Sequence, residues 1–513
     1  MKNADNDLKA IISHAKEYGY IFPSSEIYDG LNAVYDYGQN GVELKKNIVE
    51  YWWKSMVQMH ENIVGIDSAI FMNPTTWEAS GHTEAFNDPL IDNRDSKKRY
   101  RADVLIEDYV EKINSKIEKE ISKASKKLGE DFDRSHFINN NPNVLRYEKD
   151  KEDILNRMSK SLEKEDLNDI KLLIEELGIS CPISGTKNWT DVRQFNLMFK
   201  TALGSITEGA TDLYLRPETA QGIFVNFLNV QKTGRMKIPF GIAQVGKAFR
   251  NEIVARQFIF RMREFEQMEM QFFIHPDQCE KWFEYWKEKR LKWHTALGID
   301  PNNYRFHEHK KLAHYSNMAV DIEFKFPFGT KELEGIHSRT NFDLMAHERY
   351  SGKKIKYFDS KTEESYTPFV IETSIGLDRM FLAVFSNSLK TEHLEDNSTR
   401  TVLSLPKVIA PIKVAILPLV KSSELREMAT KIAKDLKLHF NVTYDEKDSI
   451  GKRYRRQDAQ GTPLCITVDH DSLEDDSVTL RFRDSMKQQR VSTDNLHKLI
   501  YEEVDMTNIL KKI

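Results

Sequence analysis

The stretch Arg263-Glu264-Phe265-Glu266-Gln267-Met268-Glu269-Met270-Gln271-Phe272 decides the fold, because its polar and apolar side chains alternate. Successive residues of a β-strand point to opposite faces, so this pattern predicts a strand with one buried face. The apolar face holds Met268, Met270, Phe272 and Ile274. The opposite face holds Phe265, Gln267, Glu269 and Gln271. Solvation at a sheet edge would explain this polarity, but the flanking segments favour a binding site.

A second strand is predicted just upstream, where the alternate residues Gln244, Gly246, Ala248, Arg250 and Glu252 share a face. Residues 254–259 would form the loop of a hairpin whose second strand starts near Phe260. This hairpin gathers several arginines, and permanently charged guanidiniums are suited to bidentate binding of polyphosphates. Surface ion pairs use the same residues, so the hairpin alone does not define a function.

A strand followed by a helix is predicted over residues 369–379. Glu372 and Ser374 share one strand face, and Gly376 permits a close turn before apolar residues appear at helical spacing. Arg379 lies in the first helical turn, where the helix dipole favours an anion. A cation at that position indicates a task such as holding a phosphate group.

Composition divides the rest of the chain into segments. A helix is predicted over residues 41–58, followed by a strand over 68–72 that Asn73 and Pro74 would end. Residues 101–178 are rich in Lys and Glu and predict a mostly helical insertion, with charged faces that are either solvated or in contact with nucleic acid. The predicted domains are residues 1–100 (the N-terminal part of the core), 101–178 (the insertion), 179–403 (the antiparallel core) and 411–513 (a small α/β domain).

Length, charge and composition restrict the classes of protein to which this chain can belong. The chain has 513 residues, a formal net charge of −4, 30% charged residues and 40% hydrophobic residues. This balance excludes wholesale polybasic binding of nucleic acid but permits a local basic patch. No apolar run reaches the roughly 20 residues that span a bilayer, so no membrane contact is expected. Three widely separated cysteines exclude a disulfide framework and favour a reducing, cytoplasmic location.

Several segments resemble the signature motifs of class II aminoacyl-tRNA synthetases. Arg250-Asn251-Glu252 with Arg263-Glu264-Phe265 is similar to the second motif, and Gly376-Leu377-Asp378-Arg379 is similar to the third. The helix predicted over residues 41–58 and the strand after it resemble the first motif, which forms the dimer. Within the class, residues 20–28, 215–222 and 372–374 are similar to the dimeric type of glycyl-tRNA synthetase. The resemblance covers about residues 20–491 and fails only across the helical insertion.

The resemblance implies an α+β fold: an antiparallel β-sheet core flanked by helices, a helical insertion and a C-terminal α/β anticodon-binding domain. It implies that glycine reacts with ATP to give glycyl-adenylate and pyrophosphate, and that glycine then passes to the 3′ end of its tRNA. Two alternatives stay open, namely a related ligase that makes adenylates without charging tRNA and an inactive accessory-subunit relative. An inactive relative should lack Arg250, Glu269 or Arg379, and all three are present.

The same resemblance assigns the nucleotide site. The catalytic residues are expected to be Arg250, Glu269 and Arg379. The residues expected to contact ATP are Arg250, Asn251, Glu252, Phe260, Arg261, Arg263, Phe265, Glu332, Leu333, Gly376, Leu377, Asp378 and Arg379. Within this set, Arg250 would hold the α-phosphate, Phe265 would stack on adenine, and Arg379 would bind the γ-phosphate end. Glu332 and Glu372 are the expected ligands of Mg²⁺.

Glycine offers only its ammonium and carboxylate groups for recognition. The residues expected to bind it are Arg101, Glu218, Phe265, Gln267, Glu269, Glu372, Thr373, Ser374 and Gly376. Converging carboxylates would hold the ammonium group, and Ser374 would exclude a side chain by steric clash. Clustered acids raise one another's pKa unless cations compensate. We therefore expect Arg101 and Mg²⁺ to balance them, and glycine affinity to weaken below about pH 6.

Two further segments concern tRNA and zinc. The C-terminal domain resembles the anticodon-binding domain of glycyl, histidyl, prolyl and threonyl enzymes. The basic residues expected to contact tRNA are Lys452, Arg453, Arg455 and Arg456. The stretch Cys181-Pro182-Ile183-Ser184 is similar to a zinc knuckle of some relatives. Because Ser184 replaces the second cysteine, no structural zinc is expected.

Overall fold

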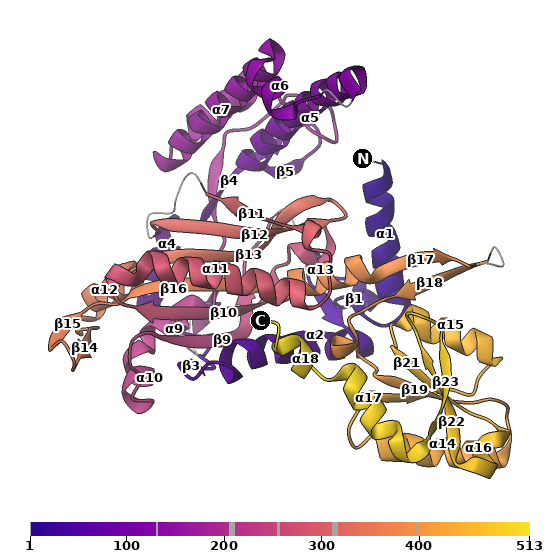
Figure 1. Cartoon of the computed structure of the whole chain (residues 1–513). Coiled ribbons are helices and arrows are strands. Elements are labelled where there is room, and N and C mark those ends of the chain that lie inside the picture. Colours follow the sequence, from indigo (N-terminus) through magenta and orange to yellow (C-terminus); the bar gives the residue numbers. More distant parts are fainter. Residues whose placement is uncertain (1, 130–131, 205–210, 254–256, 310–315, 395–397) are drawn as a thin grey trace. The chain divides into compact units, whose positions relative to one another are not determined.

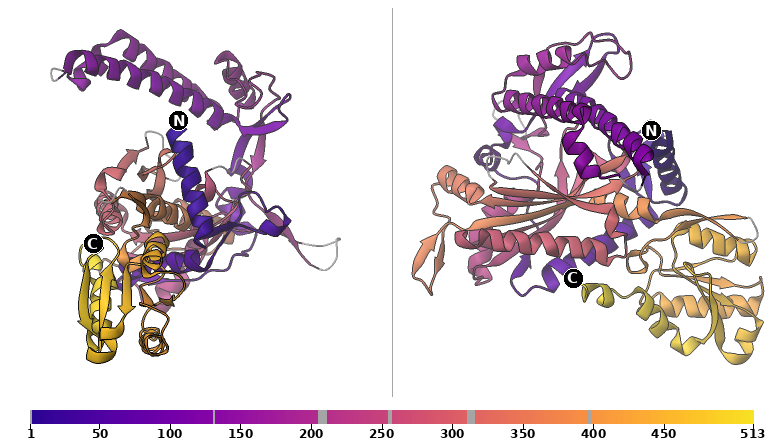
Figure 2. Two further views of the ribbon diagram at one scale, coloured as in Figure 1. Left: turned by 90° about the vertical axis from the view of Figure 1, so that its right-hand side faces the viewer. Right: turned by 45° about the horizontal axis from the view of Figure 1, so that its top comes forward.

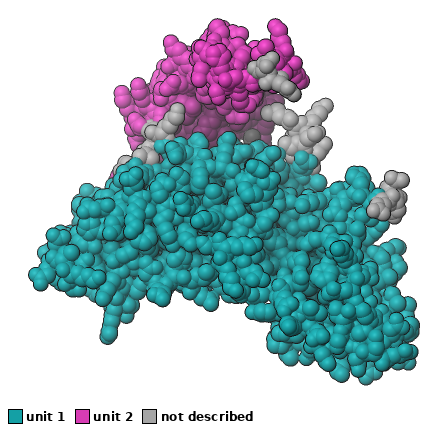
Figure 3. Space-filling model, in the orientation of Figure 1, with its two compact units in different colours: residues 1–80, 199–250, 255–513 teal, residues 81–198, 251–254 magenta. Residues whose placement is uncertain are grey.

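The alternating stretch that decides the fold is an inner strand of a seven-stranded sheet in this computed structural model (Figure 1). The structure describes residues 2–129, 132–204, 211–253, 257–309, 316–394 and 398–513. It divides into two units (Figure 3), the first comprising Met1–Ser80, Phe199–Arg250 and Ala255–Ile513, and the second Gly81–Met198 and Asn251–Val254. Within the described part of the chain, no helix is both long and apolar enough to cross a membrane.

The large sheet belongs to the first unit and is antiparallel except at one edge, where β3 pairs with β9 in parallel. Its strands, in spatial order, are β11 (Tyr304–Glu308), β12 (Met318–Phe326), β13 (Gly329–Thr340), β16 (Phe369–Gly376), β10 (Glu264–Ile274), β9 (Phe240–Phe249) and β3 (Ile63–Gly65). The four apolar side chains predicted on one face of β10 are all buried, which confirms that face as core. The opposite face of β10 is therefore left for polar groups.

Besides α1 (Lys2–Glu17), three helices contribute to the same core as the apolar face. They are α2 (Gln39–Trp53), α11 (Cys279–Ala296) and α13 (Leu377–Ser388). Figure 2 shows α11 lying lengthwise along the sheet, and its Phe283, Trp286 and Trp293 are buried there. The strand and helix predicted over residues 369–379 are confirmed as β16 and the start of α13.

Two boundaries differ from the predictions. The strand predicted over residues 68–72 is wrong, since Phe71 forms only an isolated bridge with Leu215 and Pro74 precedes helix α3 (Thr75–Ala79). The backbone of Ser68 makes hydrogen bonds with side chains rather than with a neighbouring strand. Its amide donates to Gln244 Oε1 at 3.0 Å, and its carbonyl accepts from Arg216 at 2.8 Å. The strand of this region that pairs with the large sheet is β3, which precedes residues 68–72 in the sequence.

The hairpin loop is longer than predicted. Its second strand, β10, begins at Glu264 rather than near Phe260, and a 3-10 turn covers Phe258–Phe260. Gln257 and Phe258 have φ of 70° and 60°, outside the strand region, which keeps this stretch out of the ladder. Residues 254–256 of the predicted loop lie outside the described residues.

The second unit consists of a small sheet and a group of helices. Its sheet has the order β5 (Lys98–Arg101), β4 (Asn87–Asn93), β6 (Arg193–Asn196). Its helices are α4 (His82–Ala85), α5 (Ala102–Leu128), α6 (Arg134–Asn140), α7 (Pro142–Glu163) and α8 (Leu167–Glu176). Asn141 caps α7 by accepting from two backbone amides, and Pro142 occupies its first turn. The unit is wider than the predicted insertion of residues 101–178, because the strands on both sides belong to it.

The C-terminal part of the first unit has a five-stranded sheet and a core of its own. The strand order is β20 (Val442–Tyr444), β19 (Val414–Pro418), β21 (Leu464–Val468), β22 (Ser477–Phe482), β23 (Gln488–Ser492). The helices are α14 (Ser423–Leu436), α15 (Ile450–Gln460), α16 (His470–Asp475), α17 (Leu496–Val504) and α18 (Thr507–Leu510). The first three strands are parallel neighbours, as the predicted alternation of strands and helices requires.

The remaining elements of the first unit flank the large sheet. They are α1 (Lys2–Glu17), β1 (Ile21–Pro23), β2 (Tyr35–Tyr37), β7 (Lys200–Leu203), β8 (Thr211–Tyr214), α9 (Ala220–Val225), α10 (Phe227–Thr233), α12 (Phe342–Ser351), β14 (Tyr357–Asp359), β15 (Glu364–Tyr366), β17 (Leu389–His393) and β18 (Thr399–Leu403).

Candidate active site

The polar face of β10 and its neighbours forms the floor of the candidate site. The register places Glu269 between Gln244 of β9 and Ser374 of β16. The next row on the same face places Gln271 opposite Glu372. Four of these five side chains are buried, and Ser374 is half-buried. Polar groups at this depth need partners, so the hydrogen bonds among them define the site.

The structure brings together the three acids that were predicted to lie near each other. Gln271 joins two of them, since its Nε2 donates to Glu269 Oε1 at 2.9 Å and to Glu372 Oε2 at 2.7 Å. The negative charge of Glu218 reaches Glu269 and helps to raise its pKa. These residues come from β10, β16 and the segment before α9, which are distant in the sequence.

The two acids on the strands differ in charge state. Burial, the charge of Glu372 and the charge of Glu218 raise the pKa of Glu269 well above its usual value. Burial also opposes ionisation of Glu372, but Arg339, His337 and Gln271 together lower its pKa below the usual range. Glu372 is therefore ionised at neutral pH, whereas Glu269 retains a proton over a wider range of pH.

The cation that balances these acids is Arg339, which sequence reasoning missed. Its Nη1 donates to Glu372 Oε2 at 2.9 Å, while Nε and Nη2 donate to the two oxygens of Asp343 at 2.8 and 2.9 Å. Gln221 continues the network, donating from Nε2 to Asp343 at 3.0 Å and to Glu218 at 2.9 Å. A hydrogen-bonded chain therefore connects Glu372 to Glu218.

The expectation that Arg101 balances the acids stays a prediction. Arg101 belongs to the second unit, where its guanidinium lies 3.1 Å from Asp88 and 2.6 Å from Asp103. The sequence feature that could have identified Arg339 is its i, i+4 spacing to Asp343, at the point where β13 ends and the next helix begins.

Other unpredicted polar residues anchor the start of α9. The Thr219 hydroxyl donates to Glu269 Oε2, and its amide donates to Gln267 Oε1 at 3.2 Å. Gln267 in turn donates from Nε2 to Ser374 Oγ at 3.3 Å. The resemblance did include Gln267 and Glu269 among the glycine-binding residues, and Thr219, which it did not include, links the two.

Two arginine–aromatic pairs lie where the nucleotide is expected. The Arg250 guanidinium lies 5.2 Å from the ring centre of Phe265, and its Nε donates to the carbonyl of Pro217 at 3.1 Å. The Arg379 guanidinium lies 4.4 Å from the ring centre of Phe260. Arg379 also lies 3.2 Å from Glu332 Oε1, and its charge lowers the pKa of Glu332. These contacts fix the position of each guanidinium beside an aromatic ring.

Several predicted nucleotide contacts have side chains that point into the core. Leu333 and Leu377 are buried in the main hydrophobic core, so only their backbone can face a ligand. Asp378 accepts from the Tyr37 hydroxyl and from the Glu266 amide at 2.8 Å. Thr373, which was predicted among the glycine-binding residues, is likewise buried on the face opposite Glu372, as strand alternation requires.

The other predicted residues are placed as follows. Gly376 precedes α13 as its N-cap residue. Arg261 and Arg263 flank the buried Met262, and Arg263 donates to the carbonyl of Asn32 at 2.9 Å. Asn251 and Glu252 belong to the second unit, where the Asn251 amide donates to Leu197 at 2.8 Å and Glu252 is buried.

The predicted tRNA-binding residues lie on α15 and differ in exposure. Lys452 and Arg455 are exposed, and Arg456 pairs with Asp445 and Asp448. Arg453 is buried and donates to the carbonyls of Pro418 and Leu419 at 2.6 and 3.0 Å. Its guanidinium stabilises this domain through these hydrogen bonds, and its buried position keeps it from the surface where a phosphate would bind.

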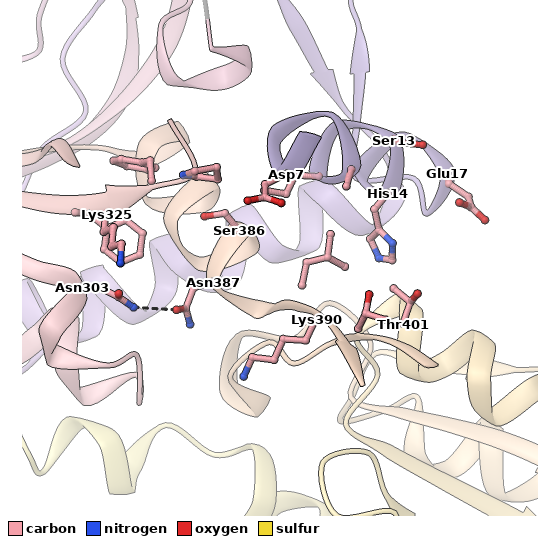
Figure 4. Close-up of a pocket in the computed structure, with 17 residues that line it drawn as sticks. Asp7, Ser13, His14, Glu17, Asn303, Lys325, Ser386, Asn387, Lys390 and Thr401 are labelled. Carbon is pink, nitrogen blue, oxygen red and sulfur yellow. Dashed lines mark hydrogen bonds between the residues drawn. The ribbon is translucent and has the colours of Figure 1, made fainter. Parts of the chain in front are cut away.

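A separate cavity of 790 Å³ is lined by α1, β12 and α13, among other elements (Figure 4). Asn303 and Asn387 share a hydrogen bond of 3.2 Å at its wall. The cavity includes none of the predicted site residues, so it is distinct from the acid cluster.

Comparison with known families agrees with this arrangement of domains. Residues 88–197 match the family described as glycyl-tRNA synthetase insertion domain 1. Residues 199–388 match the tRNA synthetase class II core domain of the G, H, P, S and T enzymes, and residues 413–503 match the anticodon binding domain. A class II core implies the use of ATP with a divalent metal ion, and an anticodon-binding domain implies a tRNA partner.

Individual relatives match along almost the whole chain. A glycine--tRNA ligase of Chlorobaculum tepidum is 49% identical over 486 residues, covering 94% of this chain and 97% of the relative. Enzymes of the same name from Macrococcus caseolyticus and Staphylococcus aureus are 48% and 46% identical, each covering at least 97% of this chain and 99% of the relative.

Among solved structures, the RNA binding domain of threonyl-tRNA synthetase from Cryptosporidium parvum shares the fold. It has a TM-score of 0.58 at 14% identity and covers 96% of this chain and 97% of that chain. The full-length matches, the three domain families and the acid cluster on the sheet agree: the chain belongs to the glycine--tRNA ligases, the class II synthetases that charge tRNA with glycine.

Proposed function

We propose that Glu218, Glu269 and Glu372 bind the ammonium group of glycine. The observation that carries this proposal is the bridge by Gln271, which holds Glu269 and Glu372 side by side on one sheet face. An ammonium group has three donors, and charge-assisted bonds to carboxylates are about twice as strong as neutral ones. Binding the cation favours the ionised form of Glu269, which then releases its proton.

Selection against larger amino acids is proposed to be steric. Ser374 lies opposite Glu269 in the register, and its Oγ accepts from Gln267 Nε2 at 3.3 Å. A β-carbon on the substrate would have to displace this pair. Exclusion of this kind can exceed the ~1–3 kcal/mol that a pocket gains from one extra methylene.

The nucleotide half is proposed to hold ATP through Arg250, Phe265 and Arg379. In the first step, a glycine carboxylate oxygen forms a bond to the α-phosphorus, and the bond to the bridging oxygen breaks so that pyrophosphate leaves. Arg250 stabilises the charge that develops on the α-phosphate, while Arg379 orients the γ-phosphate. In the second step, the 3′-terminal hydroxyl of tRNA attacks the carbonyl carbon, and AMP leaves.

Magnesium is the divalent ion that we propose to accompany ATP. Glu332 fits such a hard cation, because about half of its side chain is exposed and Arg379 lies 3.2 Å from one of its oxygens, Oε1. Glu372 fits less well, since Arg339, Gln271 and His337 already engage its two oxygens. Bound at Glu332, Mg²⁺ would neutralise phosphate charge.

The activity test is glycine-dependent exchange between ATP and pyrophosphate, followed by charging of tRNA with labelled glycine. We expect both reactions in the unaltered enzyme, and a loss of at least 10²-fold in exchange for Arg250→Ala, because the charge on the α-phosphate loses its partner. Exchange without charging would indicate a ligase that uses no tRNA. Near-normal exchange by Arg250→Ala would remove that residue from the proposed role.

We further propose that two copies associate through α2. Its inner face is buried in the core, whereas Val42, Val49 and Trp53 on its outer face line a groove of 730 Å³ with Val245. The occupant that we propose is a second copy of this chain, because this helix is the one that resembles the dimer-forming first motif.

We also propose a cytoplasmic location. Cys181, Cys279 and Cys465 are all buried free thiols, as expected of a protein kept in a reducing compartment.

A further inference from the structure

We propose that His309, Asp321 and His337 form a site for a divalent transition-metal ion of the Zn²⁺ class, distinct from the proposed Mg²⁺ position. One ligand atom from each residue lies within 4.8 Å of the other two. His309 Nε2 is 2.8 Å from Asp321 Oδ2, and His337 Nε2 is 3.9 Å from Asp321 Oδ1. Two imidazoles and one carboxylate are a common protein ligand set for zinc.

The strand register explains why these three side chains meet. His309 directly follows β11, Asp321 lies on β12 and His337 lies on β13. These three strands are adjacent at one edge of the large sheet. The His309 amide donates to the carbonyl of Ala319 at 3.2 Å, and Ala319 pairs with His337. A small methyl group therefore separates the two histidine positions along this row.

Gly335 provides the rest of the space. It pairs with Asp321, and a β-carbon at this position would lie 2.7 Å from Cε1 of His337. That distance is too short for a real contact, so only glycine lets the His337 ring lie over this row. The two small residues, Ala319 and Gly335, leave the volume between the imidazoles and the carboxylate open.

His337 is oriented as metal-binding histidines usually are. Its Nδ1 lies 3.0 Å from Glu372 Oε1, so the Nδ1 proton is held by a carboxylate. The lone pair of Nε2 is then free on the side of Asp321. In metal sites, such a carboxylate–histidine–metal arrangement fixes the tautomer and raises the basicity of the ligand.

The geometry needs only small adjustments to hold zinc. Metal–nitrogen distances of about 2.0–2.1 Å in a tetrahedral site place ligand atoms roughly 3.3 Å apart. The present separations of 2.8 and 3.9 Å bracket that value. The side chains of His309, Asp321 and His337 are 35%, 11% and 23% exposed, so an ion can enter and water can complete its coordination. Imidazole nitrogens select zinc, cobalt or nickel over magnesium.

A metal at this position would act on the glycine half of the site. His337 contacts Glu372, which is one of the proposed ammonium-binding acids, so the ion would fix the ring that donates to that carboxylate. The ion would contact Asp321 of β12 and the two histidines, none of which takes part in the Gln271 bridge.

The test uses the full chain without a histidine tag, stripped with a chelator and titrated with Zn²⁺ against a chromogenic competitor in excess Mg²⁺. We expect one tight Zn²⁺ per chain, and at least tenfold weaker binding by His309→Ala and by His337→Gln. His309 is partly exposed, so its variant should keep the melting temperature of the parent. His275→Ala is the matched control, because His275 also lies beside a carboxylate, 3.6 Å from Asp277, but outside the three-residue cluster.

A spectroscopic measurement with Co²⁺ tests the same proposed metal site. Co²⁺ should give visible absorption of four- or five-coordinate intensity in the parent and lose it in Asp321→Asn. The proposal is overturned if the parent binds no stoichiometric Zn²⁺, if Mg²⁺ displaces it at similar concentrations, or if His275→Ala weakens it as much as the two cluster variants.

Discussion

At the residue scale, Glu269 and Glu372 lie on neighbouring strands and share Gln271, yet they differ in charge. Glu372 contacts Arg339 and His337, whereas Glu269 accepts hydrogen bonds from the neutral side chains of Thr219 and Gln271. Burial and the charge of Glu372 favour the protonated form of Glu269. The empty site thus avoids two adjacent negative charges, and the incoming ammonium supplies a cation directly beside Glu269.

This difference predicts how glycine affinity depends on pH. Because the pKa of Glu269 is raised, the free enzyme holds a proton there that glycine binding releases. Affinity should therefore increase about tenfold per pH unit below that raised pKa and become constant above it. Calorimetry in buffers of different ionisation enthalpy should detect the released proton. Glu269→Gln should bind weakly and lose the pH dependence; an unchanged slope in that variant would place the proton elsewhere.

A second prediction concerns the size of the pocket. Ser374→Ala removes the oxygen that accepts from Gln267 and enlarges the space beside Glu269. We expect discrimination against alanine, measured as the ratio of kcat/KM in pyrophosphate exchange, to fall by about 10–100-fold. Thr373→Ser is the control, because Thr373 lies on the buried opposite face of the same strand. Equal selectivity in Ser374→Ala and the parent would assign the steric role to another residue.

At the element scale, β10 and β16 were predictable because the alternation of their side chains between two faces can be seen in consecutive residues. Arg339 was not, since its contact with Glu372 depends on how β13 and β16 align, and no local pattern encodes that register. The strand predicted over residues 68–72 failed for a related reason. Ser68 bonds to Gln244 and Arg216, which are distant in the sequence.

Helix α15 offers a prediction with two adjacent residues. Lys452 is exposed, so Lys452→Ala should weaken tRNA binding, reduce the salt dependence of that binding and leave pyrophosphate exchange unchanged. Arg453→Ala removes hydrogen bonds to the carbonyls of Pro418, Leu419 and Asp445 and should lower the stability of the chain by about 1–3 kcal/mol. Urea unfolding and charging assays together measure both effects. A stable Arg453→Ala variant with a selective tRNA defect would reverse this assignment.

At the scale of the whole molecule, the outer face of α2 should control the oligomeric state. Val42 is 36% exposed and lines the proposed dimer groove. Val42→Glu would place a charge against a second copy, and we expect the dimer to dissociate at least 10²-fold more readily in sedimentation velocity.

Leu438→Glu is the matched control, because Leu438 is 78% exposed on the C-terminal part and does not line the groove. A monomeric parent, or a Val42→Glu variant that associates as tightly as the parent, would contradict the proposed interface.

The position of β16 in the sheet has a consequence during synthesis. β10 and β13 are both complete well before β16 leaves the ribosome, and each pairs with β16 along one side. Until residue 376 has emerged, a nascent chain holds two long unpaired strand sides, each a template for another polypeptide. We expect the growing chain to be most prone to aggregation in that interval, which ends when β16 pairs with both strands.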